Sequence, residues 1–132
     1  MSKIREDSLQ FLENELKARG FKDLTPVHGD VIYTIATNEG LDMKTLAELT
    51  WRDKTTVTNI IKKLAATGYV KKTPSPTDGR SVELYLTNKA KKLIKPLFRI
   101  SQAYNKKLLK GFSKRQIQNL ESELKKLHHN LQ

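Results

Sequence analysis

The polar side chains between positions 53 and 64 are small hydroxyls, one amide and several ammonium groups, and their spacing is that of a helix with two unlike faces. At about 100° per residue, Val57, Ile60, Ile61 and Leu64 fall on one narrow arc. The opposite arc carries Lys54, Thr55, Thr58, Asn59 and Lys62, and no acid. We therefore predict a helix from Asp53 to Leu64 that is anchored on one face and offers the other to a polyanion.

A second candidate group lies between two segments that alternate apolar and polar residues, Tyr69 to Thr73 and Ser81 to Leu86. The connection reads Pro-Ser-Pro-Thr-Asp-Gly-Arg, and its prolines and Asp-Gly are turn residues. The pattern predicts a β-hairpin with an extended tip, a wing, that carries Arg80. An arginine on such a tip can enter a narrow minor groove, and we expect Asp78 to brace its guanidinium.

The side chains of these two segments suggest two kinds of contact with DNA, one with base edges and one with phosphates. Threonine methyls and asparagine amides suit base edges in the major groove, whereas lysines meet phosphates and give affinity without sequence choice. The candidate DNA-contacting residues are Arg52, Lys54, Thr55, Thr56, Thr58, Asn59, Lys62, Lys63, Ser75, Asp78 and Arg80.

The surrounding sequence predicts the elements that would hold these residues. A helical stripe runs from about Lys3 to Arg19 and ends at Gly20. Thr25 and Pro26 open a second helix that reaches about Thr37, and Asp42 caps a short third one, Met43 to Leu49. A short helix, a tight turn and a helix with a polar face form the order of a helix-turn-helix.

Two further helices are predicted after the hairpin. The first runs from about Asn88 to Lys110, and Pro96 should kink or break it. The last begins with the capping box of Ser113 and Gln116 and carries an apolar stripe to Leu131. The fold class is therefore mainly α with a small β-hairpin wing, in a single domain. The apolar stripes at the two ends of the chain could pack on each other or pair with a second chain.

Charge is distributed unevenly along the 132 residues, whose formal net charge is +11. Residues 1–53 hold 7 Lys and Arg against 10 Asp and Glu, whereas residues 54–110 hold 14 against 2. The positive region begins at the candidate helix, which favours nucleic acid as the partner. A run of lysines at Lys89, Lys91, Lys92 and Lys95 leaves open an architectural or RNA-binding protein held by charge alone.

The sequence lacks the residues and segments that several other functions require. The chain has no cysteine, which excludes thiol chemistry and cysteine zinc sites. It has no apolar stretch of about 20 residues and no apolar signal-peptide core, so we expect a cytoplasmic protein with no membrane partner. His28, His128 and His129 have no chelating spacing, and enzyme motifs are missing, so no metal, cofactor or catalytic residue is expected. We expect a structural or surface role for these histidines and a core position for Trp51.

Several of these segments resemble the MarR-type winged-helix transcriptional regulators, from about Leu24 to Ala90. The resemblance rests on Leu24-Thr25, Leu46-Ala47, the run Lys54-Thr-Thr-Val-Thr58, Leu64, Gly68-Tyr69-Val70, Asp78-x-Arg80 and Leu86-Thr87. Departures from the family pattern include His28 for a glutamine, Ala90 for a glycine and Trp51 for an aliphatic residue.

The resemblance implies a homodimer that binds a pseudo-palindromic operator in double-stranded DNA, as a repressor that responds to a small-molecule effector in many relatives and as an activator in others. It implies a winged lobe at about residues 24–87 and dimerisation helices at about residues 3–19 and 88–131. The expected dimerisation residues are Ile4, Leu9, Phe11, Leu12, Leu16, Leu108, Ile117, Leu120, Leu124, Leu127 and Leu131. Operator sequence, effector and effector-binding residues are not given by the sequence.

Overall fold

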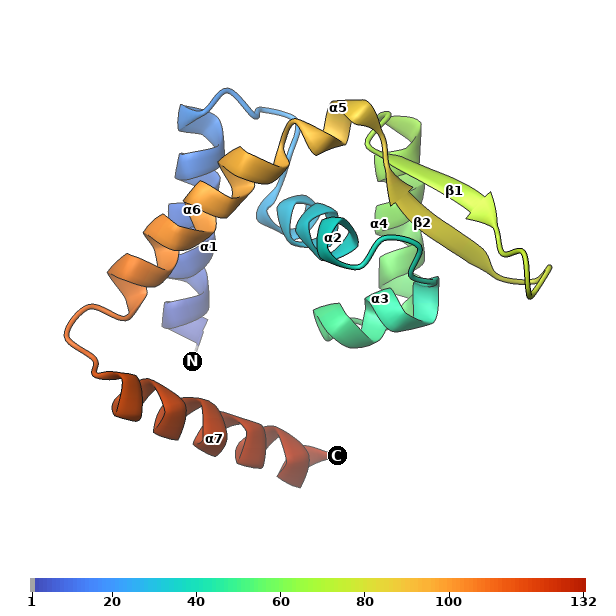
Figure 1. Ribbon diagram of the computed structural model, residues 1–132. Coiled ribbons are helices and arrows are strands. Elements are labelled where there is room, and N and C mark those ends of the chain that lie inside the picture. The colour runs from blue at the N-terminus through green and yellow to red at the C-terminus, as the bar shows by residue number, and fades with distance from the viewer. Residues whose placement is uncertain (1) are drawn as a thin grey trace.

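The computed structural model describes residues 2–132 and is mostly helical, with one two-stranded antiparallel hairpin (Figure 1). This confirms the predicted fold class. The elements in chain order are α1 (Ser2–Ala18), α2 (Pro26–Thr37), α3 (Met43–Thr50), α4 (Lys54–Ala66), β1 (Val70–Pro74), β2 (Val82–Leu86), α5 (Asn88–Lys91), α6 (Ile94–Leu108) and α7 (Lys114–Leu131).

Local hydrogen bonds start the helices at the residues that the sequence indicates. The side chains of Thr25, Asp42, Asp53 and Ser113 each accept a hydrogen bond from the backbone N–H three residues later. These bonds satisfy N–H groups that have no partner inside the helix. Asp53 is therefore the cap of α4, one residue outside the helix that we expected to include it.

The predicted long helix from Asn88 to Lys110 is divided into α5 and α6, which confirms the break and places it before Pro96. Proline has no N–H for a carbonyl four residues earlier, and its ring collides with that carbonyl. For Pro96 this carbonyl belongs to Lys92, which is where α5 ends. Pro96 itself then lies in the first turn of α6, where its missing N–H costs nothing.

The buried core holds the helices and the hairpin of the winged part together. It is formed by α2, α3, α4 and the inner face of the hairpin, and it continues into α1, α5 and α6 through Leu16, Ala90, Leu97 and Ile100. Its largest fully buried side chains are Val31, Ile32, Ile35, Leu46, Val57, Ile61, Leu64 and Leu84. The apolar arc of α4 lies within it, with Ile60 packed at its edge. The polar face of α4 consequently has a fixed orientation towards solvent.

Backbone hydrogen bonds fix the hairpin relative to the helices. Val70 pairs with Leu86 and Pro74 with Val82. On the other side of β2, Leu84 exchanges hydrogen bonds with the loop before α3: its N–H donates to Leu41 at 3.0 Å and its carbonyl accepts from Gly40 at 2.9 Å. The wing is therefore bonded to the segment that leads into the helix-turn-helix.

Helices α1 and α6 pack on each other and on α2, away from the wing (Figure 1). The Ser8 and Tyr104 hydroxyls, 2.7 Å apart, join α1 to α6. Leu16 is buried in this contact and Leu12 packs against the core. Both side chains thus have contacts within one chain, and their assignment to an interface between two chains stays a prediction.

Helix α7 leaves the end of α6 and runs below the lobe (Figure 1). No residue of α7 is buried, and Leu120, Leu124, Leu127 and Leu131 are 44%, 45%, 59% and 89% exposed. Ile4 and Leu108 are likewise exposed, whereas Leu9, Phe11 and Ile117 are partly covered. In residues 2–132, no helix combines the length and apolar character needed to cross a membrane.

Candidate nucleic-acid interface

The outward face of α4 has the composition that we expected from the sequence. Thr55, Asn59 and Lys62 are exposed, and Lys54 and Lys63 lie beside them on the same side of the helix. Within residues 2–132, the side chains of Thr55 and Asn59 have no hydrogen-bond partner. Their methyl, hydroxyl and amide groups are available for base edges.

Two other threonines of α4 use their hydroxyls within the helix. Asp53 accepts hydrogen bonds from the Thr56 N–H and the Thr56 hydroxyl, both at 2.8 Å. These bonds, the backbone one first, lower the pKa of Asp53 and keep its carboxylate charged. The half-buried Thr58 donates its hydroxyl to the Lys54 carbonyl at 2.7 Å. Thr56 and Thr58 can therefore present a methyl group to a partner more readily than a hydroxyl.

The wing tip is held by side chains that bond to its own backbone. The Ser75 hydroxyl accepts from the N–H groups of Thr77 at 3.3 Å and Asp78 at 3.2 Å. Asp78 accepts from the N–H of Arg80 at 3.0 Å. Our expectation that Asp78 would brace the Arg80 guanidinium was wrong: Asp78 lies only two residues before Arg80, so its carboxylate reaches the Arg80 backbone N–H first. The Arg80 side chain is exposed.

The tip and the start of α4 share one hollow, about 340 Å³ in volume, with the first turn of α3. Its charged lining residues are Asp42, Lys44, Lys54, Asp78 and Arg80. The structure thus brings two predicted cations, Lys54 and Arg80, to the same place. Sequence analysis missed the third, Lys44, because one lysine on a short helix has no pattern that sets it apart.

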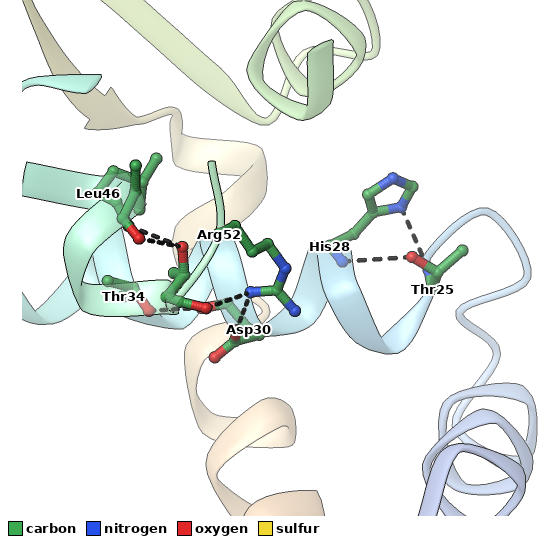
Figure 2. Close-up of polar contacts among 8 residues, drawn as sticks. Thr25, His28, Asp30, Thr34, Leu46 and Arg52 are labelled. Atoms are coloured by element: carbon green, nitrogen blue, oxygen red, sulfur yellow. Dashed lines mark hydrogen bonds and ion pairs between the residues drawn. The ribbon is translucent and has the colours of Figure 1, made fainter. Parts of the chain in front are cut away.

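Arg52 differs from the other predicted contact residues. Its guanidinium donates to the Asp30 carboxylate of α2 at 2.7 Å and to the Thr50 carbonyl at 3.2 Å, so it points back towards α2 (Figure 2). The structure gives this cation a partner inside the molecule and separates it from the outward face of α4.

Contacts at the far end of α4 involve another lysine of the basic region. Lys89 donates to the Thr67 carbonyl at 2.8 Å, and its Nζ lies 4.2 Å from the centre of the Tyr69 ring. Burial, followed by the hydrogen bond to Asp23, raises the pKa of Tyr69 to about 12. Tyr69 therefore keeps its proton at neutral pH and donates it to Asp23 at 2.7 Å. Lys89 has a structural role in addition to its charge.

We expected His28 to have a structural or surface role. His28 is buried, and its Nδ1 accepts from the Thr25 N–H at 3.2 Å (Figure 2), which confirms a structural role. Burial lowers the pKa of His28, so the ring is neutral and Nδ1 can accept.

Trp51 is 71% exposed, so our placement of this residue in the core was wrong. It ends α3 with a left-handed backbone, φ +57°, which turns its side chain outwards. The ring makes an edge contact with His128 of α7, with centroids 4.6 Å apart.

Comparison with known proteins agrees with this arrangement. The model of the MarR family matches residues 22–81, which include α2 to the tip of the wing. The chain is 29% identical over 114 residues to the uncharacterized HTH-type transcriptional regulator YybA of Bacillus subtilis, covering 85% of this chain and 76% of YybA. It is 38% identical over 84 residues to the HTH-type transcriptional regulator SarZ of Staphylococcus saprophyticus, covering 63% of this chain and 58% of SarZ.

A solved structure extends the likeness beyond the matched segment. A MarR family transcriptional regulator from Listeria monocytogenes, complexed with a 26mer DNA, superposes with a TM-score of 0.84 at 25% identity, covering 98% of this chain and 85% of the other. The chain is similar to the MarR family in sequence and to MarR-type winged-helix regulators in fold. The relatives and the structural neighbours are transcriptional regulators and not enzymes, which agrees with the expectation from the sequence, and the fold that they share with this chain is the winged helix.

Proposed function

We propose that this protein is a MarR-family regulator that binds double-stranded DNA in a sequence-specific way, as a homodimer on a pseudo-palindromic operator, and thereby represses transcription. The observation that carries the proposal is the exposed polar face of α4 beside the wing arginine. Thr55 and Asn59 have unused polar groups there, and Lys54 and Arg80 line one hollow. Relatives of the family solved with DNA support this reading.

The proposed contacts follow from side-chain chemistry. Thr55, Thr56, Thr58 and Asn59 meet base edges in the major groove, and Arg80 enters the adjoining minor groove. The phosphate contacts are made by Lys54, Lys62, Lys63 and Ser75, with Lys44 added from the structure. Asp78 acts through the backbone of Arg80.

A homodimer would cover the apolar side chains that one chain leaves exposed. The lobe of residues 24–87 would read DNA, and the helices of residues 3–19 and 88–131 would join the two copies. The exposed stripe of α7 supports this division, since solvent-exposed leucines in a row favour burial against a partner. The dimer would act in the cytoplasm.

A small-molecule effector would have a site between the two parts of the chain. A cavity of about 180 Å³ lies between α1, α2 and α6, and its lining includes Leu16, Asp30, Tyr33 and Tyr104. An effector held there would touch both the terminal helices and α2. This position supports a response in which binding changes how the lobes are held.

Selection of bound duplexes from a random pool tests the proposal directly. A specific dimer should enrich an inverted repeat whose half-sites are about 10 bp apart. It should also prefer that site over unrelated duplex by about 10³-fold or more. Enrichment of no common sequence would favour the alternative, a non-specific or architectural nucleic-acid-binding protein held by its lysines.

Replacing Lys62 with alanine should weaken binding to all duplexes by a similar factor. A lysine that neutralises one phosphate contributes about 0.9 to the slope of log affinity against log salt. We therefore expect a flatter slope by about that amount and an unchanged ranking of operators. Titration at several salt concentrations measures both, and a changed ranking would contradict the role.

Replacing Asn59 with alanine should change which bases are preferred. A bidentate amide contact to adenine discriminates by about 1–3 kcal/mol. The position that Asn59 contacts should lose its preference in the selection, while the other positions and the salt slope stay the same. An unaltered selected sequence would assign Asn59 a supporting role only.

A further inference from the structure

Arg52 lies in the turn between the two helices of the helix-turn-helix, directly before the cap of α4. Of the two ion pairs in residues 2–132, that of Arg52 with Asp30 joins residues 22 positions apart, whereas Arg19 and Glu15 lie one helical turn apart at the end of α1. Figure 2 shows the Arg52 side chain extended towards Asp30 on α2. This cation thus fixes the turn to α2.

The backbone connects the ion pair to the first residue of α4. The N–H of Arg52 donates to the Ala47 carbonyl at 3.0 Å, which ties it to the end of α3. Asp53, the next residue, caps α4 by accepting from Thr56 at 2.8 Å. A displacement of Arg52 would therefore move the capped end of α4, from which Thr55 projects.

We infer that the Arg52–Asp30 ion pair positions the reading helix, and that Arg52 contributes to DNA binding through this contact and not by touching a phosphate. The inference rests on the proposed function. The inference predicts that Asp30 favours DNA binding by holding Arg52, although a negative charge by itself would oppose it.

The exposure of the two side chains separates positioning from folding. The Arg52 and Asp30 side chains are 25% and 51% exposed, and pairs this accessible to solvent add little to folding stability. The buried side chains Leu46, Val57 and Ile61 hold α3 and α4 without them. Variants of the pair should consequently remain folded, so that their DNA affinity can be measured.

A charge exchange provides the decisive experiment. Asp30→Arg and Arg52→Glu are prepared singly and together, and the double variant keeps the net charge of the wild type. We expect each single change to weaken binding to the selected operator by about fivefold and the double change to recover most of that loss. Thermal unfolding followed by circular dichroism checks that all three variants are folded.

A direct phosphate contact gives the opposite pattern. Asp30→Arg would then leave binding unchanged or strengthen it, because it adds positive charge, and the double variant would bind as poorly as Arg52→Glu. That result would overturn the inference. It is distinct from failure of the proposed function, in which the wild-type chain itself would show no preference for any duplex.

The salt dependence gives an independent readout with a matched control. Arg52→Gln should lower affinity at every salt concentration and leave the slope of log affinity against log salt unchanged. Lys62→Ala, the control, should flatten that slope by about 0.9. An equal flattening in both variants would identify Arg52 as a phosphate contact and contradict the positioning role.

Discussion

Leu124→Glu should dissociate the proposed homodimer and weaken operator binding by at least about a hundredfold. Leu124 lies in the middle of the exposed stripe of α7, and a carboxylate there would be buried without a partner in the dimer. Two linked reading helices gain about 10²–10⁴ in affinity over one because the second binds from a high effective concentration. Light scattering measures the mass and a titration measures operator affinity.

A matched control distinguishes loss of the stripe from the effect of the added charge. Ser122 lies two residues before Leu124, about 200° around the helix, and is also exposed. Ser122→Glu adds the same charge to the opposite face and should leave both mass and affinity close to wild type. If Leu124→Glu remained a dimer with full affinity, the interface would have to lie elsewhere on the terminal helices.

Arg80→Ala should weaken operator binding by about 10- to 100-fold without unfolding the protein. An arginine that contacts DNA specifically contributes about 1–3 kcal/mol. Arg80 is exposed at the wing tip and contributes no buried surface, so the thermal unfolding curve should not change. Fluorescence anisotropy with the selected duplex measures the affinity.

Arg80→Lys provides the comparison for this variant. Lysine keeps the charge and loses the planar guanidinium, so it should restore the salt-dependent part of binding and leave the preference at the flanking bases weakened. Equal operator affinity of wild type and Arg80→Ala would remove the wing from the interface.

The sequence by itself determined the helices, their ends and the composition of the reading face. Thr25, Asp42 and Ser113 were identifiable as caps because each bonds to a backbone group three residues away. Asp53, which we expected to lie inside the helix, caps α4 in the same way. The break before Pro96 follows in the same way from a carbonyl four residues earlier. Such interactions lie within one helical turn, so residue order alone specifies them.

The position of the basic region was also encoded in the sequence. The charge imbalance begins at Lys54, and the polar arc of α4 follows from helical spacing. The structure added Lys44, which reaches the same hollow as Lys54 and Arg80 only because the hairpin is bonded to the loop before α3.

Only the tertiary structure decided which charged and apolar side chains already have a partner within the chain. Arg52 appeared equivalent to the other cations until its guanidinium was found on Asp30, 22 positions away. Leu16 and Leu124 both occupy apolar stripes, but Leu16 is buried in its own chain and Leu124 is exposed. Partners distant in sequence depend on how the helices pack, and helical spacing defines a face without defining what covers it.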